Sequence, residues 1–482
     1  MFDLRPVGYV IGLLVACLGV SMLVPMAVDI AADNGHWPVF AQSAILTTVT
    51  GGLMALATAN GMGRGLSIQQ TFMLTTMTWV ALPLFGALPF YLDSAEVRFV
   101  DAFFEAMSGM TTTGSTVLTG ISELPEGLKI WRGLMQWFGG IGIIVVAMVF
   151  LPELRVGGMQ IFRSEGFDTF GKILPRAGEI ARNISVIYLS LTVACGLAYL
   201  AAGQTPLDAT THAMTTIATG GFANHDASFG AYAGASEYIA AGFMMLAALP
   251  FVRYVQLLAG TAQPLFRDTQ IQTFFAIALI LVVTLALAQQ ATGYNTGEEA
   301  WRKALFNAVS ILTGTGYASD NYPLWGTWAV ALFFLMGLIG GCAGSTSCAI
   351  KVFRFQLLFA SIKSQIRRIH SPHGIFQPRY QGRSVSDEVV SSVMTFFIMF
   401  MVSLGVLAVL LGMTGLDFIT SVSGAATALA NIGPGLGEII GPAGNFAPLN
   451  DTAKWLLIAG MLIGRLELVS VYVLFTLTFW RN

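Results

Sequence analysis

Residues 303–318 read KALFNAVSILTGTGYA, a helix-forming apolar stretch that ends in alternating Thr and Gly. Three further segments align with it, without a gap, on one glycine: DAFFEAMSGMTTTGST at 101–116, DATTHAMTTIATGGFA at 208–223 and TSVSGAATALANIGPG at 420–435. The aligned glycines are Gly114, Gly221, Gly316 and Gly433. Each copy also has Ala eight residues before its glycine and Ser or Thr six residues before it. The chain therefore contains one direct repeat in four copies.

The composition indicates a membrane protein. Of the 482 residues, 55% are hydrophobic and only 10% are charged, whereas soluble domains carry about 25% charged residues. Runs of about 20 apolar residues are long enough to cross a bilayer. The apolar runs predict about ten spanning helices, near residues 7–31, 38–60, 68–92, 128–151, 181–203, 236–258, 271–292, 324–348, 388–413 and 453–480. The formal net charge of -2, with basic residues spread over several links, gives no indication of a nucleic-acid partner.

Each copy of the repeat lies between two predicted spans and is too short to cross a bilayer, so we expect a re-entrant helix followed by a turn. Asp101 and Asp208, at the first position of their copies, are expected as N-cap residues, and Ser310 is expected to end its helix. These features predict an all-α polytopic membrane protein: a leading helix pair, then four helix–pore loop–helix units around a pseudo-fourfold pore. The predicted boundaries are 1–66 for the leading pair, 67–152 for the first unit, 153–258 for a cytoplasmic link and the second unit, 259–350 for the third unit, and 351–482 for another cytoplasmic link and the fourth unit.

Basic residues predict the orientation. The links at 152–180 and 351–386 contain Arg and Lys, and the link at 253–269 contains Arg253 and Arg267, whereas the alternate gaps lean acidic. The positive-inside rule places these links in the cytoplasm. With an even number of spans, both termini are then cytoplasmic, and all four re-entrant segments lie on the outer side.

The four turns have the composition of an ion filter. A dehydrated cation needs oxygen ligands, which backbone carbonyls supply at high density, and glycine permits the dihedral angles that turn successive carbonyls inward. None of the turns carries a carboxylate beside its glycine, so the site is built from dipoles, as suits a monovalent cation. The predicted filter residues are Thr112, Thr113, Gly114, Thr219, Gly220, Gly221, Gly314, Thr315, Gly316, Asn431, Ile432 and Gly433. Close helix packing could explain any one turn, but not four copies in phase.

The signatures TTTGS at 111–115, ATGGF at 218–222, TGTGY at 313–317 and NIGPG at 431–435 resemble those of the Trk/Ktr/HKT potassium transporter superfamily, most closely its bacterial TrkH-type subunits. The resemblance covers essentially the whole chain. It implies potassium as the transported ion, because a glycine at each filter position marks potassium preference in that family. It also implies a bacterial inner membrane, a homodimer, and a cytosolic TrkA-type nucleotide-binding ring as partner. The fourth loop departs most, since Asn431 and Ile432 stand where other loops have Thr and Gly or Thr, and this could distort one quadrant.

The segment GLIGGCAGSTSCAIK at 337–351 ends the eighth predicted span. Its glycine spacing matches a close helix contact; alternatively, the Gly/Ser/Thr stretch unwinds below the filter and acts as a gate. The family resemblance implies the second, an intramembrane loop in the third repeat. Lys351 either snorkels to the cytoplasmic interface or holds the loop closed. The predicted gate residues are Gly340, Gly341, Gly344, Ser345, Thr346, Ser347, Lys351 and Arg465.

Arg465 lies in the middle of the last predicted span, with no other charge in 455–464 or 468–480. A lone Arg at this depth is costly and usually faces a bundle interior or a cavity. Glu467 is two residues away, on a different helix face, and cannot pair with it locally. Arg465 therefore either forms an interhelical ion pair or places a positive charge in the pore below the filter, as the resemblance also implies.

The predicted function is potassium-selective translocation by a protein that is not an enzyme and has no organic cofactor. A proton- or sodium-coupled secondary cation transporter is the alternative, although such proteins usually show inverted repeats and acidic residues in mid-span. A scaffold or an enzyme gives no reason for four phased turns. The basic links at 152–180 and 351–386 suit anionic lipid headgroups and, by the resemblance, the nucleotide-binding ring; both can hold.

Overall fold

A computed structural model of the chain describes residues 3–61, 66–93, 97–145 and 177–481. Regular structure in this part is helical except for one antiparallel hairpin of β1 (Arg379–Tyr380) and β2 (Arg383–Ser384). Six of its helices are long and apolar enough to cross a membrane, or up to eight if two bent helix pairs each count as one span. The predicted all-α class is thus confirmed in the described residues.

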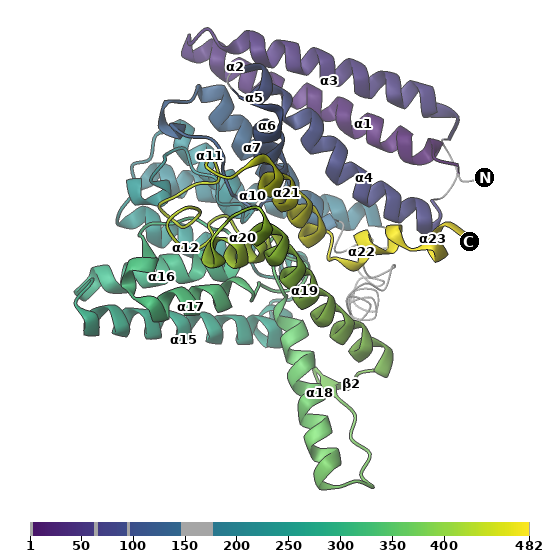
Figure 1. Cartoon of the computed structure of the whole chain (residues 1–482), viewed down its shortest axis with the longest axis vertical. Helices are drawn as coiled ribbons and strands as arrows, with labels where there is room; N and C mark the ends of the chain where they lie inside the picture. The colour runs from purple at the N-terminus through teal and green to yellow at the C-terminus, as the bar shows by residue number, and fades with distance from the viewer. Residues whose placement is uncertain (1–2, 62–65, 94–96, 146–176, 482) are drawn as a thin grey trace.

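The leading segment consists of α1 (Arg5–Ser21), α2 (Leu23–Ala32), α3 (Trp37–Thr58) and the short η1 (Ala59–Gly61). Helices α1 and α3 lie side by side along most of their length (Figure 1). A Cβ atom built on Gly12 would lie 2.6 Å from the Ala55 nitrogen, and one on Gly51 would lie 2.4 Å from the Ala16 nitrogen. Glycine at both positions therefore allows the two backbones to approach closely.

Four helical units follow, each with a helix of 12 to 17 residues directly before its loop, called here the short helix of the unit. The first unit has α4 (Ile68–Gly86), α5 (Leu88–Asp93), α6 (Phe99–Met110), η2 (Ile121–Glu123) and α7 (Glu126–Val145). The second has α10 (Ala177–Ala201), α11 (Pro206–Ile217), η5 (Ser228–Ala231), α12 (Ala235–Ala247) and α13 (Phe251–Leu258), followed by α14 (Gln263–Arg267). The third has α15 (Thr269–Thr292), α16 (Gly297–Thr313), η6 (Tyr322–Trp325) and α17 (Thr327–Gly337). The fourth has α19 (Asp387–Met413), α20 (Phe418–Ala430), α21 (Asp451–Arg465), α22 (Val469–Tyr472), η7 (Val473–Phe475) and α23 (Leu477–Arg481).

The units close into a ring. The helix after each loop packs against the short helix of the next unit: α7 against α11, α12 against α16, α17 against α20, and α21 against α6. The last of these contacts joins the fourth unit to the first, so the four short helices α6, α11, α16 and α20 surround a common centre. This is the predicted pseudo-fourfold arrangement.

Two predicted spans are bent rather than continuous. The span at 236–258 divides into α12 and α13, which meet at 86°. Pro250 lies at the break; it has no backbone N–H, and it disfavours helical dihedral angles at Leu249 before it. The span at 453–480 divides after α21, and the two parts meet at 106°. Here Glu467 and Leu468 have φ values of 57° and 53°, which an α-helix cannot accommodate.

Smaller expectations also need correction. The eighth predicted span is α-helical only over α17, and the chain from residue 338 to 351 is irregular, as in the unwound alternative. Asp101 and Asp208 are not N-caps but lie in the first helical turn, where a negative charge is still favourable. Helix α16 continues past Ser310 to Thr313. Residues 146–151 of the fourth predicted span, and the link at 152–180 up to residue 176, lie outside the described residues.

Helix α18 (Val352–His370) and the β-hairpin project from the body of the molecule (Figure 1). Gln381 and Gly382 have φ values of 48° and 81°, as a two-residue hairpin turn requires. The projecting part of α18 carries Arg367 and Arg368 beside the exposed Ile369. This arm begins directly after the irregular segment that ends at residue 351.

Candidate ion-conduction site

The four loops that follow α6, α11, α16 and α20 meet at one place. A Cβ atom built on each aligned glycine would strike the backbone of the next loop in the chain order. The distances are 2.1 Å from Gly114 to the Gly220 oxygen, 1.9 Å from Gly221 to the Thr315 oxygen, 2.6 Å from Gly316 to the Gly433 nitrogen, and 3.0 Å from Gly433 to the Gly114 oxygen. Ordinary Cβ contacts exceed 3.4 Å. The loops therefore form a closed ring with no room for side chains at these positions.

The loops also share an unusual backbone. The residue two positions before the aligned glycine is left-handed in all four copies, with φ values of 54° at Thr112, 50° at Thr219, 78° at Gly314 and 52° at Asn431. The aligned glycine itself has φ of 83°, 79° and 83° in the first three loops. Gly433 does not share this positive φ. Asn431 thus conforms to its counterparts, and the fourth loop departs from the other three at Gly433.

A hollow opens on one side of the ring. All four aligned glycines line it, together with residues of the surrounding loops such as Thr116, Phe222 and Ala318. Asp226 stands at its wall and accepts hydrogen bonds from the N–H groups of Ile121 at 3.1 Å and Ser122 at 3.2 Å. Burial by itself raises the pKa of the Asp226 carboxyl, but these donors and the Ser122 hydroxyl outweigh it, so the pKa lies below its ordinary value. This loop carboxylate is therefore negatively charged at neutral pH.

Buried polar side chains of α6 and α7 stabilise the first two loops. Arg132 on α7 is 1% exposed; it pairs with Glu105 on α6 at 2.9 Å and donates to the Ala223 oxygen at 2.7 Å. Gln136, one turn further along α7, donates to the Gly220 oxygen at 2.6 Å. Neither residue was predicted from the sequence. A charge inside a predicted span was a signal that could have indicated Arg132, although Lys129 lies one turn before it.

Lysines bind loop carbonyls in the third and fourth units. Lys303 Nζ donates to the Ser319 oxygen at 2.7 Å and lies 3.2 Å from Glu237. Lys454 pairs with Asp101 and donates to the Ala447 oxygen at 3.1 Å. These cations are tied to carboxylates and carbonyls and do not point freely into the ring.

All predicted gate residues except Arg465 lie on the other side of the ring, in the segment 338–351. Gly340 N–H donates to the Ile350 oxygen at 2.9 Å, which folds the segment back on itself. Cys342 N–H donates to the Ala248 oxygen at 3.0 Å, across the break between α12 and α13. The other predicted members, Gly341, Gly344, Ser345, Thr346 and Ser347, are buried in this turn. Lys351 is 9% exposed and donates to the Ser347 oxygen, so it ties the segment and does not snorkel to an interface.

Arg465 ends α21 beside this segment and is 2% exposed. It donates to the Cys348 sulfur and, at 2.9 Å, to the Gly139 oxygen of α7. No carboxylate pairs with it among the described residues; Glu467 pairs instead with Arg354 at the start of α18. The ion-pair alternative thus has no partner in this part of the chain, and the placement of Arg465 in a pore below the filter stays a prediction.

Cys348 is a contact residue that sequence reasoning missed. Its sulfur lies 3.7 Å from the Thr112 hydroxyl in the first loop. A Cβ atom on Gly314 of the third loop would lie 3.4 Å from its nitrogen. Cys348 thus stands directly between the ring and Arg465.

Comparisons with known proteins agree with this architecture. The TrkH family model, described as a cation transport protein, matches residues 36–480. The chain is 44% identical over 479 residues to the Trk system potassium uptake protein TrkI of Halomonas elongata, covering 99% of this chain and 97% of the relative. It is 36% identical over 488 residues to the Trk system potassium uptake protein TrkH of Escherichia coli K12, covering 99% of each. The crystal structure of the potassium transporter TrkH from Vibrio parahaemolyticus matches with a TM-score of 0.92 and 33% identity over 100% of both chains.

These matches confirm the predicted fold class and the prediction that the chain is not an enzyme. They extend over nearly the whole length of the chain and of its relatives, so the leading helices and all four units are included. The chain therefore belongs to the TrkH family of cation transport proteins.

Proposed function

We propose that this chain is a potassium-selective translocation subunit, in which the ring of four loops is the selectivity filter. The observation that carries the proposal is the closed contact among the four aligned glycines, each against the backbone of the next loop. The names of its relatives, which are potassium uptake proteins, support potassium as the ion. Ions would be collected in the hollow beside Asp226 and pass through the ring one at a time.

Filter chemistry rests on backbone dipoles. The short helices α6, α11, α16 and α20 end immediately before the loops, so the partial negative charge of their C-termini is directed at the centre. Left-handed residues redirect successive carbonyls, and carbonyls can replace the hydration shell of a potassium ion. The buried cations around the ring are neutralised by partners such as Glu105 and Asp101, which leaves the centre favourable to a cation.

The segment 338–351 and Arg465 would form the gate. Cys348 lies against the first and third loops and accepts a hydrogen bond from Arg465. A positive charge with no described carboxylate partner raises the energy of a cation that leaves the filter on this side. The gate would open when the segment moves away from the ring.

Regulation would come through the projecting arm. Helix α18 begins one residue after the gate segment, so a force on the arm reaches the gate directly. We propose an inner-membrane homodimer with cytoplasmic termini, whose basic arm contacts anionic lipid and a cytosolic TrkA-type nucleotide-binding ring. The exposed Ile366 and Ile369 give the arm an apolar surface for such contacts.

The test is ion flux through the purified chain in liposomes. With potassium and sodium gradients applied separately, potassium flux should exceed sodium flux and follow the potassium gradient alone. The same measurement is repeated with and without a proton gradient. Flux that requires a proton or sodium gradient would support the coupled transporter instead, and equal potassium and sodium fluxes would reject the filter.

A further inference from the structure

Asn431 differs from its counterparts in what its side chain can do. At the same left-handed position, Gly314 has no side chain and the Thr219 hydroxyl donates to the adjacent Ala218 oxygen at 2.8 Å. Asn431 Nδ2 instead donates to the Thr113 hydroxyl of the first loop at 3.0 Å, and to the Met461 oxygen of α21 at 2.9 Å. The amide of Asn431 therefore joins the fourth loop to the first loop and to α21.

The direction of these hydrogen bonds is fixed. The Thr111 hydroxyl donates to the Met107 oxygen at 2.7 Å, and a carbonyl can only accept. The Thr113 hydroxyl, 2.7 Å from that of Thr111, must therefore donate to Thr111. Its remaining lone pairs accept from the Asn431 amide, so the three bonds run in one direction into α6. Hydrogen bonds aligned in this way polarise and strengthen one another.

At two other junctions between units of the ring, side-chain hydrogen bonds connect a loop with the neighbouring unit. Between the first and second units, Gln136 donates to the Gly220 oxygen and accepts from Phe222 N–H at 3.0 Å. Between the second and third units, the Tyr317 hydroxyl hydrogen-bonds to Thr215 and, at 3.2 Å, to Thr216. These side chains fix each loop relative to its neighbour.

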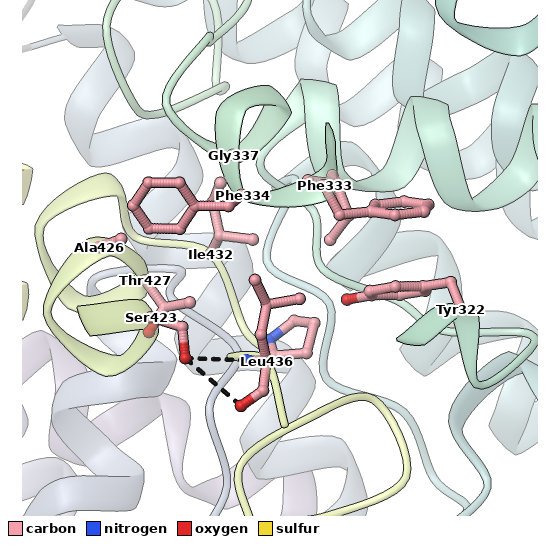
Figure 2. Close-up of a pocket in the computed structure, with 11 residues that line it drawn as sticks. Tyr322, Phe333, Phe334, Gly337, Ser423, Ala426, Thr427, Ile432 and Leu436 are labelled. Atoms are coloured by element: carbon pink, nitrogen blue, oxygen red, sulfur yellow. Dashed lines mark hydrogen bonds between the residues drawn. The ribbon is translucent and has the colours of Figure 1, made fainter. Parts of the chain in front are cut away.

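Hydrogen bonds between the third and fourth units lie on the gate-segment side of the ring, where Ala349 N–H donates to the Ala430 oxygen at 3.0 Å and Arg465 donates to the Cys348 sulfur. Among the described residues, no hydrogen bond connects the third loop with the fourth. Ile432 points into an apolar cavity between α17 and α20, where Phe333, Phe334 and Leu436 surround it (Figure 2). The Ser423 hydroxyl in this cavity bonds to the backbone of Leu436, within the fourth unit. In the described residues, packing and not hydrogen bonding therefore holds the fourth loop against the third loop.

We propose that the Asn431 side chain is a positioning residue for ion selectivity, which fixes the fourth loop through the Thr113 hydroxyl and does not itself bind the ion. The inference rests on the proposed filter. The amide supplies a hydrogen bond between the fourth loop and the first loop. The contact between the fourth loop and the third loop has no such bond in the described residues. Ser115 adds a second hydrogen bond between the first and fourth loops, since its hydroxyl donates to the Gly433 oxygen at 2.8 Å.

The experiment is a cycle of variants in liposomes, with the potassium-to-sodium permeability ratio as the readout. Asn431→Gly keeps the left-handed backbone and removes the amide. Thr113→Val removes the hydroxyl that accepts from it, with little change in shape. Each should lower the ratio about fivefold, the effect of one net hydrogen bond of ordinary strength. The double variant should lower it no further, and Thr113→Ser should restore most of it.

Asn295→Gly is the matched control, because Asn295 Nδ2 also donates two hydrogen bonds, to Gln289 and Asp320, away from the ring. It should leave the ratio unchanged. If the parent is selective and neither Asn431→Gly nor Thr113→Val lowers its permeability ratio, the inference is overturned. Additive effects of the two substitutions in the double variant would also overturn it. If Asn431→Gly fails to fold, Thr113→Val and Thr113→Ser still decide the matter. A parent with no potassium preference would instead reject the proposed function.

Discussion

Four different side-chain environments support one left-handed residue in each loop. Thr112 and Thr219 are β-branched, and a positive φ costs such residues about 1 kcal/mol or more. Gly314 avoids this cost, and Asn tolerates the conformation better than most residues. The loops thus reach the same backbone by different routes. Strain at Thr112 and Thr219 can persist because the surrounding contacts determine the loop path more strongly than local preference does.

Gly316→Ser should lower the preference for potassium over sodium. Its φ is +83°, and an added Cβ would lie 2.6 Å from the Gly433 nitrogen and 2.9 Å from Pro434 Cδ. The third and fourth loops would have to separate, which widens the ring and weakens the fit to a dehydrated ion. The measurement is the permeability ratio in liposomes, where we expect a drop of about tenfold or more, from a shift of about 1.4 kcal/mol.

Gly405→Ser is the control for this variant. Gly405 lies in α19, and a Cβ atom there would meet nothing within 4 Å. The control should keep the ratio of the parent. An unchanged ratio in Gly316→Ser would remove the third loop from the filter.

Arg465→Ala should raise ion flux without changing the potassium-to-sodium ratio. The variant removes a buried charge below the ring, together with its hydrogen bonds to Cys348 and Gly139. Both changes lower the barrier on the gate side, and neither alters the loops. We expect an increase of about tenfold, which corresponds to about 1.4 kcal/mol. Arg465→Lys keeps the charge and should stay near the parent rate, whereas unchanged or lower flux in Arg465→Ala would contradict the barrier role.

Elements were predictable where hydrophobic length alone decides them. The spans corresponding to α15 and α19 are uninterrupted apolar runs, and both are single helices. The bend after α12 had a signal in Pro250 that a hydropathy reading ignores. The bend after α21 had none, because Glu467 and Leu468 are ordinary helix formers forced into left-handed backbone by tertiary contacts, including the pair between Glu467 and Arg354.

His36 should make stability depend on pH. It precedes α3, and its ring contacts Asp93 of α5 and, at 3.2 Å, Asp29 of α2. The hydrogen bond to Asp93 raises its pKa, burial opposes this, and Asp29 raises it further, so the net pKa lies above 6.5. The stabilisation is complete below the unfolded pKa, where both states are protonated, and is lost as pH rises through the folded pKa.

Thermal unfolding in detergent, measured between about pH 6 and about pH 9, tests this expectation. As the pH rises over this range, the unfolding temperature of the parent should fall by more than that of His36→Gln, which has no titrating ring. Equal pH slopes in the two proteins would show that the contacts of His36 with Asp29 and Asp93 do not depend on its charge.

The repeat in the sequence predicted where the loops lie in the whole molecule. It did not predict which side chains from other units bind each loop. Phase and spacing in the sequence indicate that four copies lie in equivalent places. Nothing in that pattern shows that Gln136 reaches the second loop from the first unit, or that Asn431 reaches the first loop from the fourth. Such contacts join residues far apart in the chain, and their partners emerge only when the ring closes.

Orientation in the membrane is the expectation that involves the whole molecule. The N- and C-termini lie close together on one side (Figure 1), as an even number of spans requires. The arm carries Arg367 and Arg368, and the positive-inside rule assigns it to the cytoplasm. Cysteines introduced at Ile369 on the arm and at Glu123 beside the hollow should therefore label from opposite sides. Cys17→Ala removes the exposed native thiol and leaves only buried ones.

A membrane-impermeant maleimide added to intact cells, with access through the outer membrane provided, should react with Glu123→Cys. It should react with Ile369→Cys only after the inner membrane is opened, because basic segments resist translocation. Leu246→Cys, whose exposed native side chain lies on α12 in a helix pair apolar enough to span a membrane, should stay unlabelled in both conditions. The reverse labelling pattern would show that the molecule has the opposite orientation in the membrane. The hollow beside Asp226 would then face the cytoplasm, Arg465 would face outward, and a cytosolic ring could not reach the arm that leads to the gate.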